Sequence, residues 1–176
     1  SVAAINFDAA RVTFGHINLD NAAAYILNGP GSLNINGRTG AAIIVATTGN
    51  HVVNALVNIQ TDTRVDTAPG TALSFTNGMS IASNHTLDVG GSGVLNLSGT
   101  MSNGANAAIA EDTGTVNFNS DVGNGLAGTD RPSVYVSVST GNAVANLNVS
   151  QHLNQLTVND TGTAVITHSG GTNIVI

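Results

Sequence analysis

A short pattern of apolar residues and glycine recurs about every 22 residues along the chain. In its clearest copy, Leu87 and Val89 are followed by Gly93 and then by Leu95 and Leu97. The apolar residues alternate with other residues, which is the period of a β-strand, whereas a helix would space them about three to four residues apart. Eight copies can be traced, and they start at Ile5, Tyr25, Ile43, Val65, Leu87, Ala108, Tyr135 and Leu156.

A repeat of this length indicates a solenoid, in which each coil buries its apolar face by stacking on its neighbours. Leucine-rich and helical repeats have periods in the same range, but they need helices or a fixed leucine pattern that this sequence lacks. We therefore predict an all-β fold, a single-domain parallel β-solenoid (β-helix) over residues 1–176 with about eight coils and a period near 20–22 residues. Because parallel strands lie about 4.8 Å apart, the rod would be roughly 35 to 40 Å long.

Glycine and asparagine are predicted to form the corners between strands. Gly93 and Gly162 each fall between two strands, where the chain must turn with a positive φ or leave room for the next coil. Asparagine tolerates similar turns, and stacked asparagine side chains can form hydrogen-bonded ladders from coil to coil. The asparagines expected at corners include Asn28, Asn50, Asn77 and Asn159.

Composition excludes several classes of protein. The chain has four arginines, no lysine and a formal net charge of −6, so it lacks the clustered cations that a nucleic-acid binder needs. Apolar residues make up 41% of the chain, which argues against disorder. Cysteine is absent, so disulfides and thiolate metal sites are excluded. No apolar run is long enough to span a bilayer, and residues 1–20 lack the pattern of a signal peptide, so we expect no transmembrane segment.

The regular repeat is interrupted between Met101 and Arg131, where the step between copies is longest. We predict a protruding loop at residues 121–132, with its glycine-rich part at Gly123 to Pro132. Binding residues often lie on loops that a rigid scaffold positions, so this loop is a candidate binding site.

Residues 144–158 read VANLNVSQHLNQLTV and are followed by Gly162-Thr163-Ala164-Val165-Ile166. This segment and the repeat resemble secreted bacterial proteins with autotransporter-associated β-strand repeats, and the resemblance covers about two thirds of the chain. It implies a β-helical passenger or surface protein with an extracellular or cell-surface location. It carries strand and corner motifs and implies no activity. His152 lies in the shared segment, and we expect it to make a structural hydrogen bond.

Two aspartates are weak candidates for a metal site. A step of 22 residues places Asp88 beside Asp66 on the outer face, where two carboxylates about 5 Å apart could bind calcium. Glu111 and Asp112 form the only adjacent acidic pair, and we expect them at a solvated corner with no catalytic role. We expect no cofactor. The phenylalanines, Phe7, Phe14, Phe75 and Phe118, are expected in the core.

The two ends of the chain are apolar and carry no charge or proline that would discourage strand pairing. Self-association through these ends would involve Val2, Ile5, Ile174, Val175 and Ile176. Such ends predict either head-to-tail association or continuation of the native chain beyond residue 176. We predict a homo-oligomer and a non-enzymatic structural protein of the bacterial cell exterior, either a spacer or the subunit of a head-to-tail fibre. A glycan-binding surface adhesin that uses the 121–132 loop is the alternative, and a polysaccharide lyase is a weaker one. A glycan-binding groove usually presents aromatic side chains, which are only 3% of this chain.

Overall fold

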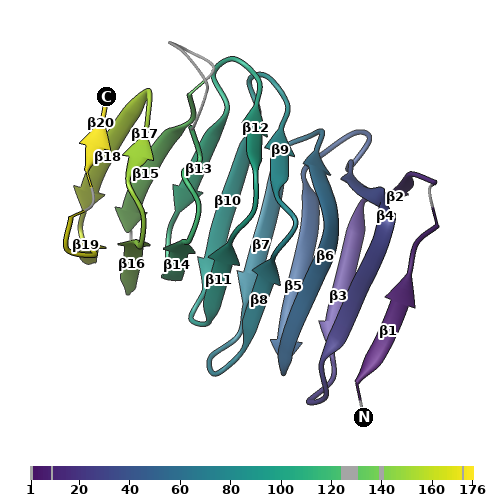
Figure 1. Cartoon of the computed structure of the whole chain (residues 1–176). Coiled ribbons are helices and arrows are strands. Elements are labelled where there is room, and N and C mark those ends of the chain that lie inside the picture. The colour runs from purple at the N-terminus through teal and green to yellow at the C-terminus, as the bar shows by residue number, and fades with distance from the viewer. Residues whose placement is uncertain (1, 9, 124–130, 139–140, 172) are drawn as a thin grey trace.

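The protein is a stack of short parallel strands (Figure 1). Strands β1 (Ala3–Asn6) and β2 (Val12–Phe14) lie at one end, and β18 (Gln155–Asp160), β19 (Thr163–His168) and β20 (Ile174–Val175) lie at the other. Our computed structural model describes residues 2–8, 10–123, 131–138, 141–171 and 173–176. In these ranges every strand pair is parallel. The same ranges contain no helix that is long and apolar enough to cross a membrane.

One broad side of the stack is a seven-stranded sheet, here called sheet B. Its strands, in order along the rod, are β3 (His16–Asp20), β5 (Ala42–Thr48), β7 (Thr63–Thr67), β10 (Thr86–Gly91), β13 (Ala108–Glu111), β15 (Ser133–Val138) and β18 (Gln155–Asp160).

The second broad side, sheet A, belongs to an eleven-stranded sheet. Its main strands are β1 (Ala3–Asn6), β4 (Tyr25–Ile35), β6 (Asn50–Ile59), β8 (Ala72–Phe75), β11 (Val94–Leu97), β14 (Gly114–Phe118), β16 (Asn142–Leu147) and β19 (Thr163–His168).

A third, narrower face is formed where the chain passes from sheet A to sheet B. The end of β4 pairs there with β2 (Val12–Phe14), and the end of β6 pairs with β9 (Met79–Ile81), which pairs with β12 (Met101–Asn103). The paired strands β17 (Gln151–His152) and β20 (Ile174–Val175) occupy the corresponding place in the last coils.

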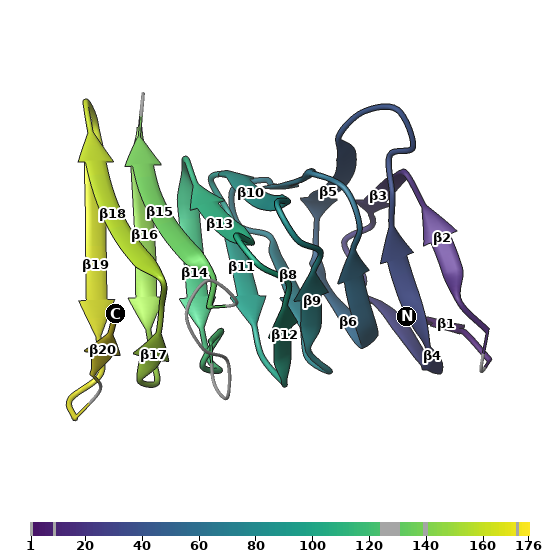
Figure 2. The same ribbon diagram turned by 90° about the horizontal axis from the view of Figure 1, so that it is seen from above.

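Each coil follows the same path, and Figure 2 shows successive coils side by side along the rod. Strands β8, β9 and β10 form one coil, and β11, β12 and β13 form the next. Ala72 pairs with Val94 and Thr86 pairs with Ala108, so one turn here takes 22 residues. The seven strands of sheet B correspond to about seven turns. The predicted all-β parallel solenoid is thus confirmed, with a number of coils close to the expected eight.

The first two copies of the sequence pattern occupy a different part of the coil from the last six. The last six copies all start in sheet B, but Ile5 and Tyr25 lie in β1 and β4 of sheet A. In the Tyr25 copy the glycine at the position equivalent to Gly93 is Gly31, which lies inside β4. A Cβ at this position would lie 2.1 Å from the carbonyl oxygen of Ala10, so glycine is needed for the close approach of a neighbouring coil.

The corner glycines were placed correctly, and their role is to leave room for the neighbouring coil. A Cβ on Gly93 would lie 2.4 Å from the carbonyl oxygen of Ala68, and one on Gly162 would lie 2.7 Å from that of Gly141. The positive φ at the corner after β10 belongs instead to Gly91, whose φ is 82°. Substitution at Gly93 is therefore disfavoured by steric contact with backbone.

The core fills the space between the faces with aliphatic side chains from every coil. Phe75 and Phe118 are fully buried among them, as predicted. Phe7 is only partly buried, and Phe14 is 36% exposed, which is a correction to the expected core. Both belong to the first coil, which has a neighbour on one side only among the described residues.

Candidate functional site

The two candidate metal ligands, Asp66 and Asp88, are not stacked on each other. In the observed register Asp88 pairs with Arg64, and Asp66 pairs with Gly90. The step from β7 to β10 is 24 residues at this point, and the predicted step of 22 residues was wrong here. The side chain of Arg64 therefore lies among these carboxylates.

Arg64 forms ion pairs with three carboxylates from three successive coils. Its Nε lies 2.9 Å from Asp66, and its Nη1 lies 2.6 Å from Asp88 and 2.7 Å from Asp112. A Cβ on Gly90 would lie only 1.8 Å from Nη2 of Arg64, so the glycine makes room for the guanidinium group. Burial acts to lower the pKa of Arg64, but the hydrogen bonds from the three aspartates outweigh it and raise the pKa above its usual value.

These contacts argue against a calcium site at Asp66 and Asp88. Calcium is bound by free carboxylate and carbonyl oxygens, whereas one oxygen of each of these aspartates is already bonded to Arg64. Among the residues that the structure describes, no group of three or more His, Cys, Asp or Glu side chains is arranged to hold a metal ion. The four side chains form a network of ion pairs that links β7, β10 and the end of β13.

Glu111 was expected at a solvated corner, and this prediction was wrong. Its inward position in β13 aligns with Val89 in β10 and Val136 in β15, and its side chain is 2% exposed. Its Oε1 accepts a hydrogen bond of 3.1 Å from the backbone amide of Val144 in sheet A. Its Oε2 is buried and has no hydrogen-bond partner among the described residues. The neighbouring Asp112 is half exposed and bonds to Arg64, so the two acidic residues have different roles.

Burial raises the pKa of Glu111 to about 8, although hydrogen bonds from the backbone of Val144 and Val116 act to lower it. The carboxyl group is therefore mostly protonated at neutral pH. A protonated carboxyl can exist in the core at a far lower cost than a carboxylate. This group joins sheet B to sheet A at one corner of the rod.

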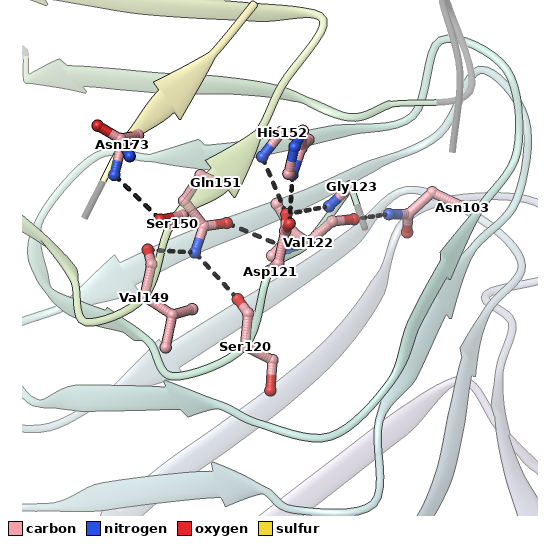
Figure 3. Close-up of polar contacts among 10 residues, drawn as sticks. All are labelled: Asn103, Ser120, Asp121, Val122, Gly123, Val149, Ser150, Gln151, His152 and Asn173. Atoms are coloured by element: carbon pink, nitrogen blue, oxygen red, sulfur yellow. Dashed lines mark hydrogen bonds and ion pairs between the residues drawn. The ribbon is translucent and has the colours of Figure 1, made fainter. Parts of the chain in front are cut away.

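Buried amide side chains bridge a gap in the third face, next to the predicted loop (Figure 3). Residues 120–123 take the place of a strand between β12 and β17. Asn103 donates a hydrogen bond of 2.8 Å to the carbonyl oxygen of Val122, and the amide of Val122 donates one of 3.0 Å to Gln151. Gln151 is fully buried and also donates to the carbonyl oxygen of Ser120. The two side chains thus replace the missing strand-to-strand hydrogen bonds.

Asp121 fixes the start of the loop through three contacts, all drawn in Figure 3. Its Oδ1 accepts hydrogen bonds from the backbone amides of Gly123 and His152, and its Oδ2 lies 2.5 Å from Nδ1 of His152. The expected structural hydrogen bond of His152 is confirmed. Most of the predicted loop, residues 124–130, lies outside the described residues, and the described parts are its two ends at 121–123 and 131–132.

The N-terminal end of the rod is open and apolar. An apolar hollow of about 390 Å³ opens within the first coil and is lined in part by Ile5, Phe7, Phe14 and Leu27. Val2 is 60% exposed and Ile5 is 46% exposed. In the described part of the chain, β1 and β3 are the outermost strands at this end of sheets A and B.

The C-terminal end also exposes apolar side chains. Ile174 and Val175 in β20 pair with β17, yet each is 40% exposed, and Ile176 is 72% exposed. Within the described ranges, β19 and β18 are the outermost strands of sheets A and B here. All five residues predicted for self-association are therefore on the surface at the two ends.

The predicted asparagine ladders are present, but most of them lie along strands. Asn117 donates a hydrogen bond of 2.7 Å to Asn96 and accepts one of 2.7 Å from Asn146. A shorter ladder on the third face runs from Asn34 through Asn58 to Ser80. Asn28, Asn50 and Asn159, which were expected at corners, lie in strands, whereas Asn77 lies outside them.

The sequence reading missed how strongly charge is separated between the sheets. The eleven strands of the sheet that includes sheet A contain no Asp, Glu, Lys or Arg. Among the strands that the structure describes, those of sheet B contain all the charged residues, which are Asp20, Arg64, Asp66, Asp88, Glu111 and Asp160. The signal was visible in the sequence only once each strand could be assigned to a sheet. Comparisons with known protein families, with curated proteins and with solved structures found no match for this chain.

Proposed function

We propose that the protein is a non-enzymatic structural component of the bacterial cell exterior, a β-solenoid spacer whose copies stack head to tail into a fibre. The observation that carries this proposal is the pair of apolar ends, at which β1, β3, β18 and β19 are the outermost strands of the sheets in the described part of the chain. An exposed strand edge offers a row of backbone N–H and C=O groups for pairing with another chain. The exposed apolar side chains beside it add a hydrophobic contribution to association.

Parallel pairing gives the contact a direction. The outermost strands at the C-terminal end can continue the parallel order only with the N-terminal end of another copy. Such a contact joins two different surfaces and does not close on itself, so it extends into a filament. The apolar hollow beside Ile5 and Phe14 supports this arrangement, because a stacked coil would cover it.

The location at the cell exterior is supported by the resemblance to secreted bacterial proteins with autotransporter-associated β-strand repeats. The lyase alternative is less favoured, because the candidate carboxylates Asp66 and Asp88 are bonded to Arg64. The adhesin that would use the 121–132 loop gains no support, because its central residues lie outside the described part of the chain.

The proposal is tested with lysine substitutions at the ends and on the side of the rod. Val175→Lys and Ile5→Lys place a charge in the proposed joint, whereas Leu56→Lys is the matched control, since Leu56 in β6 is 40% exposed like Val175. We expect the unmodified chain and Leu56→Lys to form filaments in negative-stain micrographs. The two end variants should stay monomeric in sedimentation velocity. A chain that is monomeric at all concentrations, or filaments that survive both end substitutions, would contradict the proposal.

A further inference from the structure

The described strands of sheet A carry no charged side chain on their outer side. We define the neutral face as the outward side chains of β8, β11, β14, β16 and β19. Two columns run along the rod on this face, and neighbouring residues in each column are partners in the strand register. The first column is Ala72, Val94, Thr115, Val144 and Val165, and the second is Ser74, Asn96, Asn117, Asn146 and Thr167. The first therefore offers methyl groups, and the second offers amides and hydroxyls.

The second column is a continuous hydrogen-bonded row. Asn96 donates to Ser74 at 2.9 Å, the two Asn–Asn bonds to Asn117 follow, and Thr167 donates to Asn146. A carboxamide has two N–H donors and two oxygen lone pairs, and these bonds use one of each on Asn96 and Asn117. The row is therefore fixed in position and can still bind a further partner.

A hollow lies at one margin of the neutral face. Its volume is about 490 Å³, and its polar lining includes the side chains of Ser92, Thr113 and Asn142. Thr115 and Val144 belong both to this hollow and to the first column of the neutral face. The described residues that line the hollow are all uncharged.

We propose that the neutral face binds an uncharged polysaccharide that lies along the axis of the rod, with one sugar unit in the hollow. Sugar hydroxyls match the amides and hydroxyls of the second column. The methyl groups of the first column face the C–H faces of sugar rings, in the place that aromatic side chains take in most glycan-binding grooves. Successive positions in a column lie about 4.8 Å apart, which is close to the length of one unit of an extended β-linked hexose chain. The net charge of −6 disfavours acidic polymers in the same place.

This site is distinct from the 121–132 loop and does not depend on filament formation. The absence of charge excludes a charged occupant: a polyanion would bring uncompensated charge to a surface that offers no cation, whereas a neutral chain loses no ionic hydration on binding. Binding would be spread over several coils, so each coil needs to contribute only a small amount of affinity.

The test uses four variants of the full chain in pull-down on insoluble cellulose and chitin and in affinity electrophoresis with a soluble mixed-linkage β-glucan. Thr115→Lys places a long charged side chain at the hollow, and Asn117→Asp puts a charge into the amide row. Thr157→Lys is the matched control for the first, because Thr157 lies on the outer side of β18 in sheet B. Asn58→Asp is the control for the second, because it interrupts the ladder on the third face.

We expect the unmodified chain to bind at least one neutral polymer and to leave polygalacturonate unbound. Thr115→Lys and Asn117→Asp should weaken binding by about tenfold or more, while both controls bind as the unmodified chain does. Circular dichroism and thermal melts identify any variant that fails to fold. If one face variant fails to fold, the other face variant and its own control decide the outcome. Absence of binding to all three neutral polymers would overturn the proposal. Equal losses in the face variants and their controls would overturn it as well.

Discussion

Sheets A and B are built by the same coils, yet they use different polar groups on their outer surfaces. Sheet A stacks neutral amides, as in the row from Asn96 to Asn146, whereas sheet B places Arg64 among three aspartates. Both arrangements link successive coils by side-chain hydrogen bonds. Only the second depends on ionic charge, so the comparison shows how one scaffold can carry one face that responds to salt and another that does not.

Glu111 in sheet B bonds to the backbone of sheet A, and we expect the largest effect on stability at this residue. The pKa of Glu111 is about 8 in the folded protein and near 4.5 in an unfolded chain. The folded state therefore binds this proton more tightly, so its contribution to stability is complete below about pH 4.5 and is lost as the pH rises through about 8.

We expect unfolding free energy to fall by up to ~1.4 kcal/mol per pH unit between these limits, relative to a Glu111→Gln variant. The measurement is urea unfolding of both proteins from pH 4 to about pH 9. Parallel pH profiles for the two proteins would show that Glu111 does not carry this dependence.

A larger side chain at Gly93 should disrupt the corner between β10 and β11. Gly93→Val should lower the free energy of unfolding by about 1 to 3 kcal/mol, because a Cβ meets the backbone of the preceding coil. Gly40→Val is the matched control, because a Cβ there meets no atom within 4 Å. Thermal melts of both variants check the expectation, and equal midpoints would show that the corner can adjust.

The ionic side of the comparison is tested by Arg64→Met. This change leaves Asp66, Asp88 and Asp112 facing one another without a cation, so we expect a loss of about 1 to 2 kcal/mol at low salt. The loss should become smaller at high salt, because salt screens the repulsion between exposed carboxylates. Arg11→Met controls for the change in net charge. A salt-independent loss would mean that packing of the arginine side chain is responsible.

The amide row of sheet A is tested by Asn117→Ala. This change removes one hydrogen bond to Asn96 and one from Asn146. We expect a loss of about 1 kcal/mol, since the half-buried partners Asn96 and Asn146 can still reach water. This loss should be the same at low and high salt. A salt dependence like that of Arg64→Met would remove the distinction between the two sheets.

The sequence by itself determined the class of fold. Alternating apolar residues such as Leu87 and Val89, followed by Gly93, require strands and a tight corner, and their recurrence requires stacked coils. The apolar ends and the ladder-forming asparagines could also be recognised, because these features depend on residue type and local order. Gly93 and Gly162 were found for the same reason.

Only the tertiary structure decided which residues face each other between coils. A change of two residues in the step from β7 to β10 put Arg64 beside Asp88, which a uniform repeat could not foresee. Side chains alternate between inside and outside along a strand, so the register also decided that Glu111 is buried and that Asp112 bonds to Arg64. The neutral face emerged in the same way, because a charge-free side of the rod exists only after each strand has been assigned to its sheet.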